Sequence, residues 1–531
     1  MPGQPFVATK AAVASPHQLA SAAGLRALLA GGTAVDAQIA VHAVLSVVYP
    51  NMTGLGGDAF WLIFEAATGQ VHALNGSGRS AAAATRERYR SLGYDRIPPR
   101  GPHAALTVPG AVDSWFEAHR RFGRLSIGFL LEPAIDYAES GSPVGSSLAG
   151  WLARDVELLS RYEATRRSFL SPEGAPPRAG DRLAQPDLAR TLRAIAANGP
   201  DELYRGDTAR RLLAALGTAG SPLAQADLAE HRSNWVEPIS LRYRAFDAYN
   251  FPPNSQGFAA LQILGILQST GVASLDHLSA EYVHLVVEAT KLAFEDRDRY
   301  LTDPEFAPIP LSDLLDRDYL RRRAGLIGEH ARRRVEPPRA VGDTSFSAAV
   351  DADGNAVAMI QSLYFDFGTA FVAGDTGILL QSRGCYFSLD DRHPNRLEPR
   401  KRTAHTLTPA LLLRDGRPAL VYGAMGGEGQ PQTQAALVTR VVDFGLDPQA
   451  AIDAPRWLYG PTWGETTVAL RLESRFPSAV AADLRSRGHE VDLLGRWDEL
   501  MGHANAIQID RDRGCLLAGF DPRSDGAALG Y

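Results

Sequence analysis

One β-hairpin in the middle of this chain of 531 residues constrains its fold more than any other segment. Residues 344–350 (TSFSAAV) are small and compatible with a strand, and residues 356–363 are a second, apolar strand. The intervening Asp-Ala-Asp-Gly-Asn is typical of a turn, because Gly354 tolerates a positive φ. Thr344 therefore opens the first strand, directly after Asp343. By itself, a threonine at a strand start is usually only a β-former.

The pattern of apolar residues and glycines differs between the two sides of the hairpin. Before it, the apolar periodicity predicts helices at 19–30, 34–48, 258–268 and 280–301. Segment 317–340 is very rich in arginine, which predicts a solvated face or a linker. After the hairpin, short apolar runs and glycine-rich turns predict strands. A helix-rich part and a strand-rich part that share one core are typical of an α+β fold or a layered sandwich.

The composition limits the classes of partner. Hydrophobic residues make up 45% of the chain and charged residues 21%, as in a globular protein with a sizeable core. The formal net charge of −6 argues against a nucleic-acid partner, which usually needs a basic face. The longest apolar run, 39–50, is too short to span a bilayer, so no membrane partner is expected. The N-terminus has no basic region followed by an apolar core, and a cytoplasmic location is expected.

Neither the cysteines nor the histidines predict a bound metal. Cys385 and Cys515 are the only two cysteines, so the chain has no disulfide framework and no cysteine-based zinc site. The 13 histidines are scattered, and no pair shows the spacing of metal ligands. The glycine-rich turn at 51–58 lacks the Lys-Ser/Thr of a phosphate-binding loop. We therefore expect no metal and no cofactor.

Seven short motifs carry the strongest functional signal, because they follow one another in a fixed order over nearly the whole chain. They are 31–37 (GGTAVDA), 54–57 (GLGG), 108–110 (VPG), 252–257 (PPNSQG), Thr344 with 350–357 (VDADGNAV), 425–427 (MGG), and 521–524 (DPRS) with the terminal 530–531 (GY). In this order they resemble the gamma-glutamyltransferase family, also called glutathione hydrolases, within the N-terminal-nucleophile hydrolase superfamily.

The resemblance implies a fold and a maturation step. The fold is α+β, a four-layer αββα sandwich with two stacked antiparallel sheets between helical layers. The family makes one precursor and cuts it before a catalytic threonine. Here the cut would fall between Asp343 and Thr344 and would give a large subunit of residues 1–343 and a small subunit of residues 344–531. The two subunits would share one core.

The resemblance also implies how Thr344 would act. An alcohol near its ordinary pKa is a poor nucleophile and needs a base beside it. After cleavage Thr344 would carry a free α-amine. Because such amines have a pKa of about 7.7–8.0, a useful fraction is neutral and can take the hydroxyl proton. Ser362 stands where the family has a second threonine that supports the nucleophile. Gly426 and Gly427 match the glycines whose N–H groups bind the oxyanion.

Three residues are candidates for the site that binds the substrate α-carboxylate in this family. In an alignment on 84–86 (ATR), Arg79 stands two residues from the family's usual arginine, and the loop 76–78 (GSG) could absorb this shift. Arg79 would clamp this carboxylate, since a guanidinium fits a carboxylate with two hydrogen bonds. His405 and Thr406 stand where many members have two serines, and Thr406 keeps the hydroxyl.

The pocket for the substrate α-amine departs from the family pattern. The family holds this amine with an Asn, a Gln and an Asp, and the matching positions here are Tyr364, Arg383 and Tyr386. Tyr386 stands in place of the acid, and Arg383 adds a positive charge. A substrate ammonium beside Arg383 would be unfavourable unless Arg383 is paired with an acid. The acids that could restore the missing charge are Asp366, Asp390 and Glu428.

Three functional hypotheses follow. The first is an autoprocessing amidohydrolase that cleaves gamma-glutamyl amides such as glutathione through a gamma-glutamyl-Thr344 acyl-enzyme, and transfers the acyl group to water or to an amino acid or peptide. The second is an acylase for glutaryl or other dicarboxyl amides, which Arg79 together with Arg383 would favour. The third, from another class, is an unprocessed binding protein without turnover.

The first prediction concerns Thr344→Ala. We expect this variant to show neither chain cleavage nor activity, because the hydroxyl that attacks the Asp343 carbonyl is gone. A denaturing gel with N-terminal sequencing measures this: the wild type should give one band for residues 1–343 and another that begins at Thr344. Ser345→Ala, the next hydroxyl along the strand, is the control and should still be cut. Cleavage of Thr344→Ala would refute the nucleophile, and a persistent full-length wild-type band would favour the binding protein.

Overall fold

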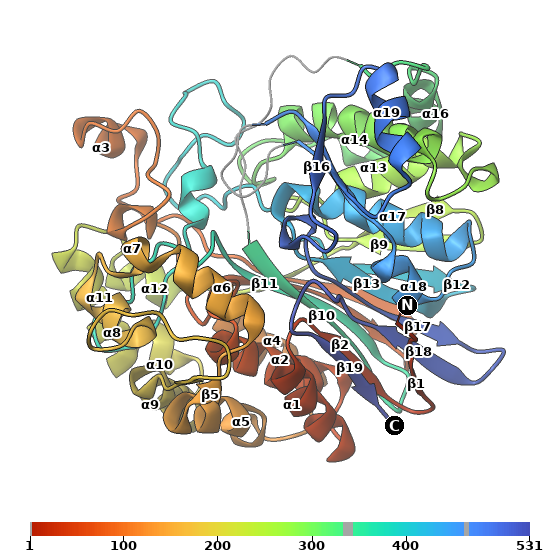
Figure 1. Cartoon of the computed structure of the whole chain (residues 1–531). Helices are drawn as coiled ribbons and strands as arrows, with labels where there is room; N and C mark the ends of the chain where they lie inside the picture. Colours follow the sequence, from red (N-terminus) through yellow and green to blue (C-terminus); the bar gives the residue numbers. More distant parts are fainter. Residues whose placement is uncertain (1–2, 333–342, 461–466) are drawn as a thin grey trace.

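Two antiparallel sheets of seven strands lie face to face, and a layer of helices covers the outer side of each (Figure 1). The computed structural model describes residues 3–332, 343–460 and 467–531. In spatial order the first sheet contains β19 (Ala527–Gly530), β2 (Ala12–Ser15), β10 (Asp343–Val350), β11 (Ala356–Tyr364), β3 (Asp58–Glu65), β4 (Gln70–Gly76) and β7 (Asn234–Val236). The second sheet contains β1 (Phe6–Ala8), β18 (Cys515–Gly519), β17 (Ala504–Asp510), β13 (Arg417–Ala424), β12 (Ala410–Arg414), β9 (Phe246–Asn250) and β8 (Ile239–Tyr243). The predicted αββα sandwich is confirmed.

The hairpin of β10 and β11 lies at the centre of the first sheet. Its strands cover Asp343–Val350 and Ala356–Tyr364, so the sequence locates both within one residue. Asp351 holds the turn, since its Oδ1 accepts the N–H groups of Asp353 at 3.0 Å and Asn355 at 2.9 Å. This side-chain turn fixes the register of the hairpin.

The chain before Thr344 and the chain after it both contribute strands to both sheets. In the first sheet, β10 pairs with β2 on one side and with β11 on the other, and β11 pairs with β3. In the second sheet, β12 pairs with β9 and β1 pairs with β18. Backbone ladders therefore join the two parts of the chain throughout the core.

Inward-facing side chains form rows across the first sheet, because side chains alternate along each strand. Phe346 pairs with Ile360, and Ile360 pairs with Phe60, and all three are buried between the sheets. Two residues further along these strands, the next pair on the same faces is Ser362 and Asp58. The apolar core between the sheets thus ends in a polar row at one end.

The helices form two outer layers. The layer over the first sheet includes α1 (Gln18–Leu29), α2 (Ala34–Val48), α4 (Ala111–Phe122), α5 (Ile127–Ser140) and α9 (Pro186–Asn198), with α3 (Arg86–Ser91), α6 (Ser146–Arg154), α7 (Val156–Leu159), α8 (Glu163–Phe169), α10 (Asp201–Tyr204), α11 (Asp207–Thr218) and α12 (Gln225–Glu230) on the same side (Figure 1). The layer over the second sheet includes α13 (Gly257–Gln268), α14 (Ala280–Tyr300), α15 (Leu311–Leu314), α16 (Arg317–Ala324), α17 (Gln430–Val442), α18 (Pro448–Asp453) and α19 (Ser478–Ser486). Two small sheets are β14 (Trp457–Tyr459), β15 (Leu470–Glu473) and β16 (Val491–Leu494), and β5 (Ser142–Pro143) with β6 (Arg182–Leu183). The four helices predicted from periodicity correspond to α1, α2, α13 and α14.

The first part of the arginine-rich segment is the helix α16, in which Arg317, Arg321 and Arg322 are exposed, so the predicted solvated face is confirmed there and the alternative of a linker is not. Asp316 caps this helix by accepting the N–H groups of Asp318 and Tyr319, and Leu320 packs against the core. Residues 333–340 of the same segment lie outside the described residues.

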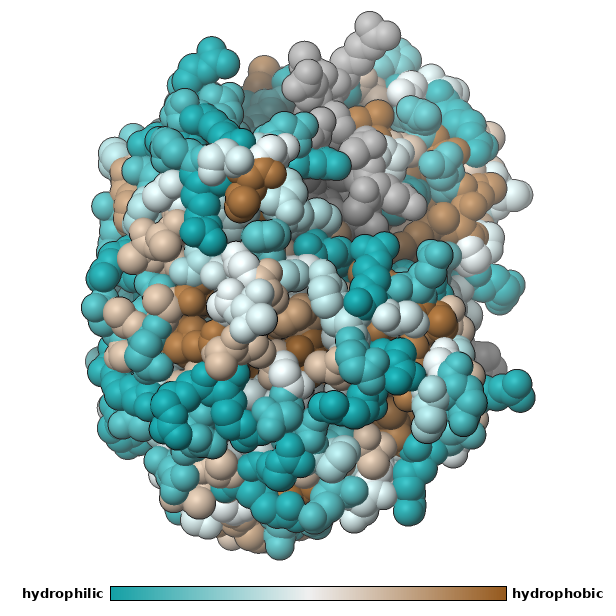
Figure 2. Space-filling model, turned by 90° about the vertical axis from the view of Figure 1, so that its left-hand side faces the viewer, coloured by the Kyte–Doolittle hydropathy of each residue, from teal (hydrophilic) through white to brown (hydrophobic). Residues whose placement is uncertain are grey.

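The helical layer around α7, α8 and α11 meets solvent with mostly hydrophilic residues (Figure 2). Over the described part of the chain, no helix is both long and apolar enough to cross a membrane.

The second prediction concerns Phe346→Ala. We expect the free energy of unfolding to fall by about 3–5 kcal/mol, because the variant leaves a cavity where the ring packs against Gly423 in the opposite sheet. Urea unfolding followed by tryptophan fluorescence measures this change. Phe306→Ala removes a ring that is 37% exposed and is the matched control, with a loss below about 1 kcal/mol. Equal losses in both variants would contradict this packing.

Candidate active site

Two hydroxyls on neighbouring strands form the centre of the site. Thr344 Oγ1 on β10 lies 3.4 Å from Ser362 Oγ on β11, and both residues are buried. Ser362 Oγ accepts the N–H of Tyr364 at 2.8 Å, which fixes the serine rotamer. The structure thus brings the predicted nucleophile and its supporting hydroxyl together. The backbone of Asp343 pairs with Tyr364, whereas the side chain of Asp343 lies outside the described residues.

Asp58 stands opposite Ser362 on β3 and is fully buried. Its Oδ1 accepts three hydrogen bonds, from Gly78 N at 3.0 Å, Gly110 N at 3.2 Å and Gln381 Nε2 at 2.9 Å. Burial raises the pKa of Asp58 to about 7, and the hydrogen bonds from Gln381 and Gly78 oppose that rise. Asp58 therefore titrates near neutral pH inside the protein.

Sequence reasoning missed Asp58. The available signal was local, because Asp58 is a carboxylate at the first position of an otherwise apolar strand, directly after the glycine-rich turn 54–57. A charge at such a position is costly to bury unless it has a role or a set of donors.

His405 contacts the other carboxylate oxygen of Asp58. Its Nε2 lies 3.1 Å from Asp58 Oδ2, and its Nδ1 has no hydrogen-bond partner among the described residues. The ring packs edge-on against Phe60, with centroids 4.7 Å apart. Burial and then the charge of Arg383 hold the pKa of His405 well below its usual range, so the imidazole is neutral.

Arg383, on the short helix η3 (Arg383–Tyr386), is a buried cation without a carboxylate partner in the described structure. Its Nη1 and Nη2 donate to Thr406 Oγ1 at 3.3 and 3.4 Å, and its guanidinium stacks over the Tyr364 ring at 3.9 Å. Its Nε has no partner among the described residues. Burial lowers the pKa of Arg383, but a guanidinium stays protonated in proteins. The site therefore holds a positive charge with unused donor capacity.

The turn after β13 supplies two backbone N–H groups. Gly426 has φ +136° and Gly427 has φ +52°, a region that favours glycine. No hydrogen bond between described residues uses either N–H. A Cβ on Gly423, just before this turn, would lie 2.6 Å from the Phe346 ring. This close packing holds β13, which leads into the turn, against Phe346 of β10.

Gln256, which sequence reasoning also missed, links this turn to Thr406. Its Nε2 donates to the carbonyls of Gly427 at 3.1 Å and Thr406 at 3.0 Å, and its Oε1 accepts from Arg297 at 3.0 Å. The side chain therefore sets the distance between Gly427 and Thr406.

Glu428 does not offer a free carboxylate to a substrate amine. Buried Arg297 forms an ion pair with it, and the Tyr386 hydroxyl donates to its Oε1 at 2.7 Å. Burial, and then the Glu428 charge, raise the pKa of Tyr386 well above its usual value, so Tyr386 is a neutral donor.

Of the other two acids proposed for the substrate amine, Asp366 is paired with arginines and Asp390 is on the surface. Asp366 accepts from Arg100 at 2.7 Å and forms an ion pair with Arg154 at 3.0 Å. Asp390 is exposed and accepts the N–H of Arg392.

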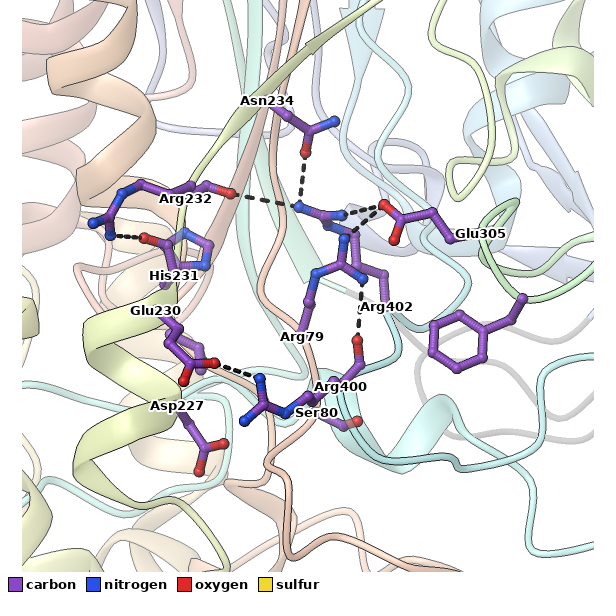
Figure 3. Close-up of a pocket in the computed structure, with 12 residues that line it drawn as sticks. Arg79, Ser80, Asp227, Glu230, His231, Arg232, Asn234, Glu305, Arg400 and Arg402 are labelled. Carbon is purple, nitrogen blue, oxygen red and sulfur yellow. Dashed lines mark hydrogen bonds and ion pairs between the residues drawn. The ribbon is translucent and has the colours of Figure 1, made fainter.

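Arg79 lines a pocket of about 560 Å³ (Figure 3). Its Nη2 is 2.6 Å from Glu305 Oε1, which Arg402 also approaches at 3.5 Å, and its Nη1 donates to the carbonyl of Arg400. None of the residues around the two hydroxyls lines this pocket. The carboxylate clamp at Arg79 stays a prediction, and the ion pair with Glu305 does not favour it.

One group of potential metal ligands lies within the described chain, away from this site. The ligand atoms of His284, Glu288 and His489 lie within 4.8 Å of one another. They are already engaged, since His284 Nδ1 is 2.8 Å from His489 Nε2 and Glu288 is 2.7 Å from Lys291 Nζ. We assign no metal to them.

The chain matches the family model described as Gamma-glutamyltranspeptidase over residues 20–531. The chain therefore belongs to the gamma-glutamyltranspeptidase family. This confirms the resemblance predicted from the seven motifs.

Several relatives within this group have different names. The chain is 50% identical over 525 residues to the glutathione hydrolase-like YwrD proenzyme of Bacillus subtilis (strain 168), with 99% of each chain covered. It is 44% identical over 531 residues to the oxamate amidohydrolase proenzyme of Klebsiella pneumoniae, again with 99% of each covered. The crystal structure of a cephalosporin acylase from Bacillus halodurans matches with a TM-score of 0.92 and 38% identity, over 100% of this chain and 97% of that one. These proteins share the family and the fold with this chain, but their names indicate different substrates.

The third prediction concerns Gly426→Ala. Alanine is strained at φ +136°, so its N–H shifts, and we expect kcat/KM for anilide hydrolysis to fall by about 10²–10³-fold. Gly445→Ala is the matched control, because Gly445 also has a positive φ of +68° but no atom within 4 Å of an added Cβ. Full activity in Gly426→Ala would contradict an oxyanion role for this turn.

Proposed function

We propose that this member of the gamma-glutamyltranspeptidase family is an autoprocessing amidohydrolase for amides whose acyl group ends in a carboxylate, which Arg383 holds. The observation that carries the proposal is the buried Arg383 guanidinium, which has no carboxylate partner among the described residues and an unused Nε donor. A buried cation of this kind is costly unless a ligand completes it.

The nucleophile would be Thr344 after cleavage from Asp343. Its free α-amine, neutral in part near pH 8, takes the hydroxyl proton, and Oγ1 attacks the amide carbonyl. Ser362, 3.4 Å away, exchanges a hydrogen bond with this hydroxyl and keeps it aligned. The same hydroxyl would earlier attack the Asp343 carbonyl, so that one group serves both maturation and turnover.

The oxyanion would be bound by the N–H groups of Gly426 and Gly427. Because both glycines have a positive φ, their N–H groups point away from the hydrogen-bond ladder of the sheet. No described residue accepts a hydrogen bond from them. Donors fixed in place before the reaction need no rearrangement as charge develops on the oxygen. Collapse of the intermediate releases the amine, and water or an amine acceptor then removes the acyl group from Thr344.

The far end of the acyl group would meet Arg383, Thr406 and His405. Thr406 Oγ1 already accepts from both Nη atoms of Arg383, so its own hydrogen is directed elsewhere and can be donated to a carboxylate. A guanidinium and a hydroxyl together suit a carboxylate of a dicarboxyl chain such as glutaryl.

A second candidate is a gamma-glutamyl hydrolase or transferase that acts on glutathione and passes the acyl group to water, an amino acid or a peptide. The 50% identical relative named glutathione hydrolase-like favours it. A gamma-glutamyl group also has a carboxylate for Arg383, but its ammonium needs an acid, and Glu428 and Asp366 are paired with arginines.

The fourth prediction compares substrates and variants of the processed enzyme. We expect a higher kcat/KM for a glutaryl anilide than for a gamma-glutamyl anilide. Arg383→Gln should lower kcat/KM for the glutaryl anilide by about 100-fold, mainly through KM, because the carboxylate loses its buried partner. Steady-state kinetics measure both effects.

The matched control for this test is Arg79→Gln, which removes a guanidinium from the pocket of Figure 3 and should leave KM for the glutaryl anilide nearly unchanged. A large effect of Arg79→Gln with none of Arg383→Gln would return the clamp to Arg79. Preference for the gamma-glutamyl anilide would favour the second candidate.

A further inference from the structure

Asp58 is the buried titratable group of this site that the proposed reaction does not use. It belongs to the polar row that ends the core, one strand away from Ser362 and two strands away from Thr344. Its donors come from separate parts of the chain: the loop at Gly78, the start of α4 at Gly110, and the segment at Gln381. One carboxyl thus joins the walls of the acyl site.

The hydrogen bonds determine where a proton on Asp58 must sit. Oδ1 is saturated by three donors, whereas the one partner of Oδ2 among the described residues is His405 Nε2 at 3.1 Å. Protonation therefore places the hydrogen on Oδ2, between the carboxyl and the imidazole.

This proton changes the character of His405. When Asp58 is ionised, Nε2 must carry the hydrogen of the neutral ring, and Nδ1 is an acceptor. When Asp58 is protonated, its O–H donates to Nε2, and the ring hydrogen moves to Nδ1. Because Nδ1 has no partner among the described residues, either state is open to the pair.

The charges around Asp58 are few. Arg383 and Arg402 both favour its ionised form. His405 is neutral, and burial holds the pKa of Tyr204 well above its usual value, so the Tyr204 hydroxyl is neutral too. No acid lies at ion-pair distance from Arg383 among the described residues, but the two groups interact electrostatically, so an ionised Asp58 offsets part of the positive charge of Arg383.

We propose that Asp58 is a positioning residue that takes up one proton from solvent when a carboxylate binds at Arg383. The inference rests on the proposed function, because it needs an acyl carboxylate at that guanidinium. The ligand carboxylate replaces Asp58 as the counter-charge of Arg383, and the proton neutralises the carboxyl that is no longer needed. At the same time His405 changes from an acceptor to a donor at Nδ1.

The direction of the pH dependence follows from this exchange. A second anion near Asp58 raises its pKa from about 7, so the bound state holds more protons than the free state. Affinity for a dicarboxylate should therefore fall as pH rises above 7, by at most about tenfold per pH unit. Because the free carboxyl is already partly protonated near pH 7, binding takes up less than one full proton per site.

The fifth prediction is tested by isothermal titration calorimetry of the processed enzyme with glutarate at pH 7. The titration is repeated in phosphate and in Tris, whose heats of ionisation differ, so that the difference in heat counts protons. We expect a net uptake of protons by the wild type, of less than one per site. Asp58→Asn keeps the shape of the carboxyl but cannot titrate, and it should bind glutarate with no uptake and with an affinity that is flat between pH 6 and 8.5.

Asp351→Asn is the matched control, because it removes a buried carboxyl at the opposite end of the same hairpin, while the asparagine Oδ1 can still accept the N–H groups of Asp353 and Asn355 that hold the turn. It should show the wild-type uptake. His405→Gln is a second variant that keeps a donor near Asp58 and cannot exchange a ring hydrogen; it should also reduce the uptake.

Each outcome is decisive. Glutarate binding with equal heats in both buffers, or uptake that persists in Asp58→Asn, would overturn the inference and leave the Arg383 clamp standing. Failure of glutarate to bind at all would overturn both the clamp and the inference that rests on it. Uptake lost in Asp58→Asn and kept in Asp351→Asn would establish the exchange.

Discussion

The register of β10, β11 and β3 determines which side chains meet at the end of the core. Phe346, Ile360 and Phe60 share one inward row, and the same alternation puts Ser362 and Asp58 in the next pair. A slip of one residue would turn that pair to the helical side, because strand side chains alternate with a period of two. The turn at Asp351 prevents the slip, so a turn at one end of the hairpin positions the chemistry at the other.

The groups that we propose for the acyl carboxylate and the oxyanion include Thr406, just before β12, and the Gly426 turn, just after β13, and contacts tie the second sheet to the first. Gly423 lies against the Phe346 ring, which holds β13, the strand that leads into the Gly426 turn, against β10. Gln256 bonds to Gly427 and Thr406 at once and is itself held by Arg297. The distances that a reaction would need are therefore set by buried contacts rather than by mobile loops.

Local sequence patterns predicted much of the fold but only part of the candidate site. The hairpin and the four long helices follow from turn chemistry and apolar periodicity, which act over a few residues. Asp58 and Gln256 were missed because their roles depend on partners far away in sequence. The Arg79 interpretation depended on one short loop, and Glu305, 226 residues away, is its partner in the structure. Segment 317–324 is helical because the Asp316 cap and Leu320 outweigh its charged composition.

In the acyl site that we propose at Arg383, electrostatics would decide which acyl groups bind. In a gamma-glutamyl group the ammonium shares a carbon with the carboxylate, so it would lie about 6 Å from the Arg383 guanidinium. At an effective dielectric constant of about 20, that repulsion is about 3 kcal/mol, or about 100-fold in affinity. A dicarboxyl chain avoids this cost. An ionised Asp58 would offset part of the repulsion, whereas a protonated Asp58 would not, so under this proposal one buried proton would separate a site for dicarboxyl groups from one that tolerates an amino acid.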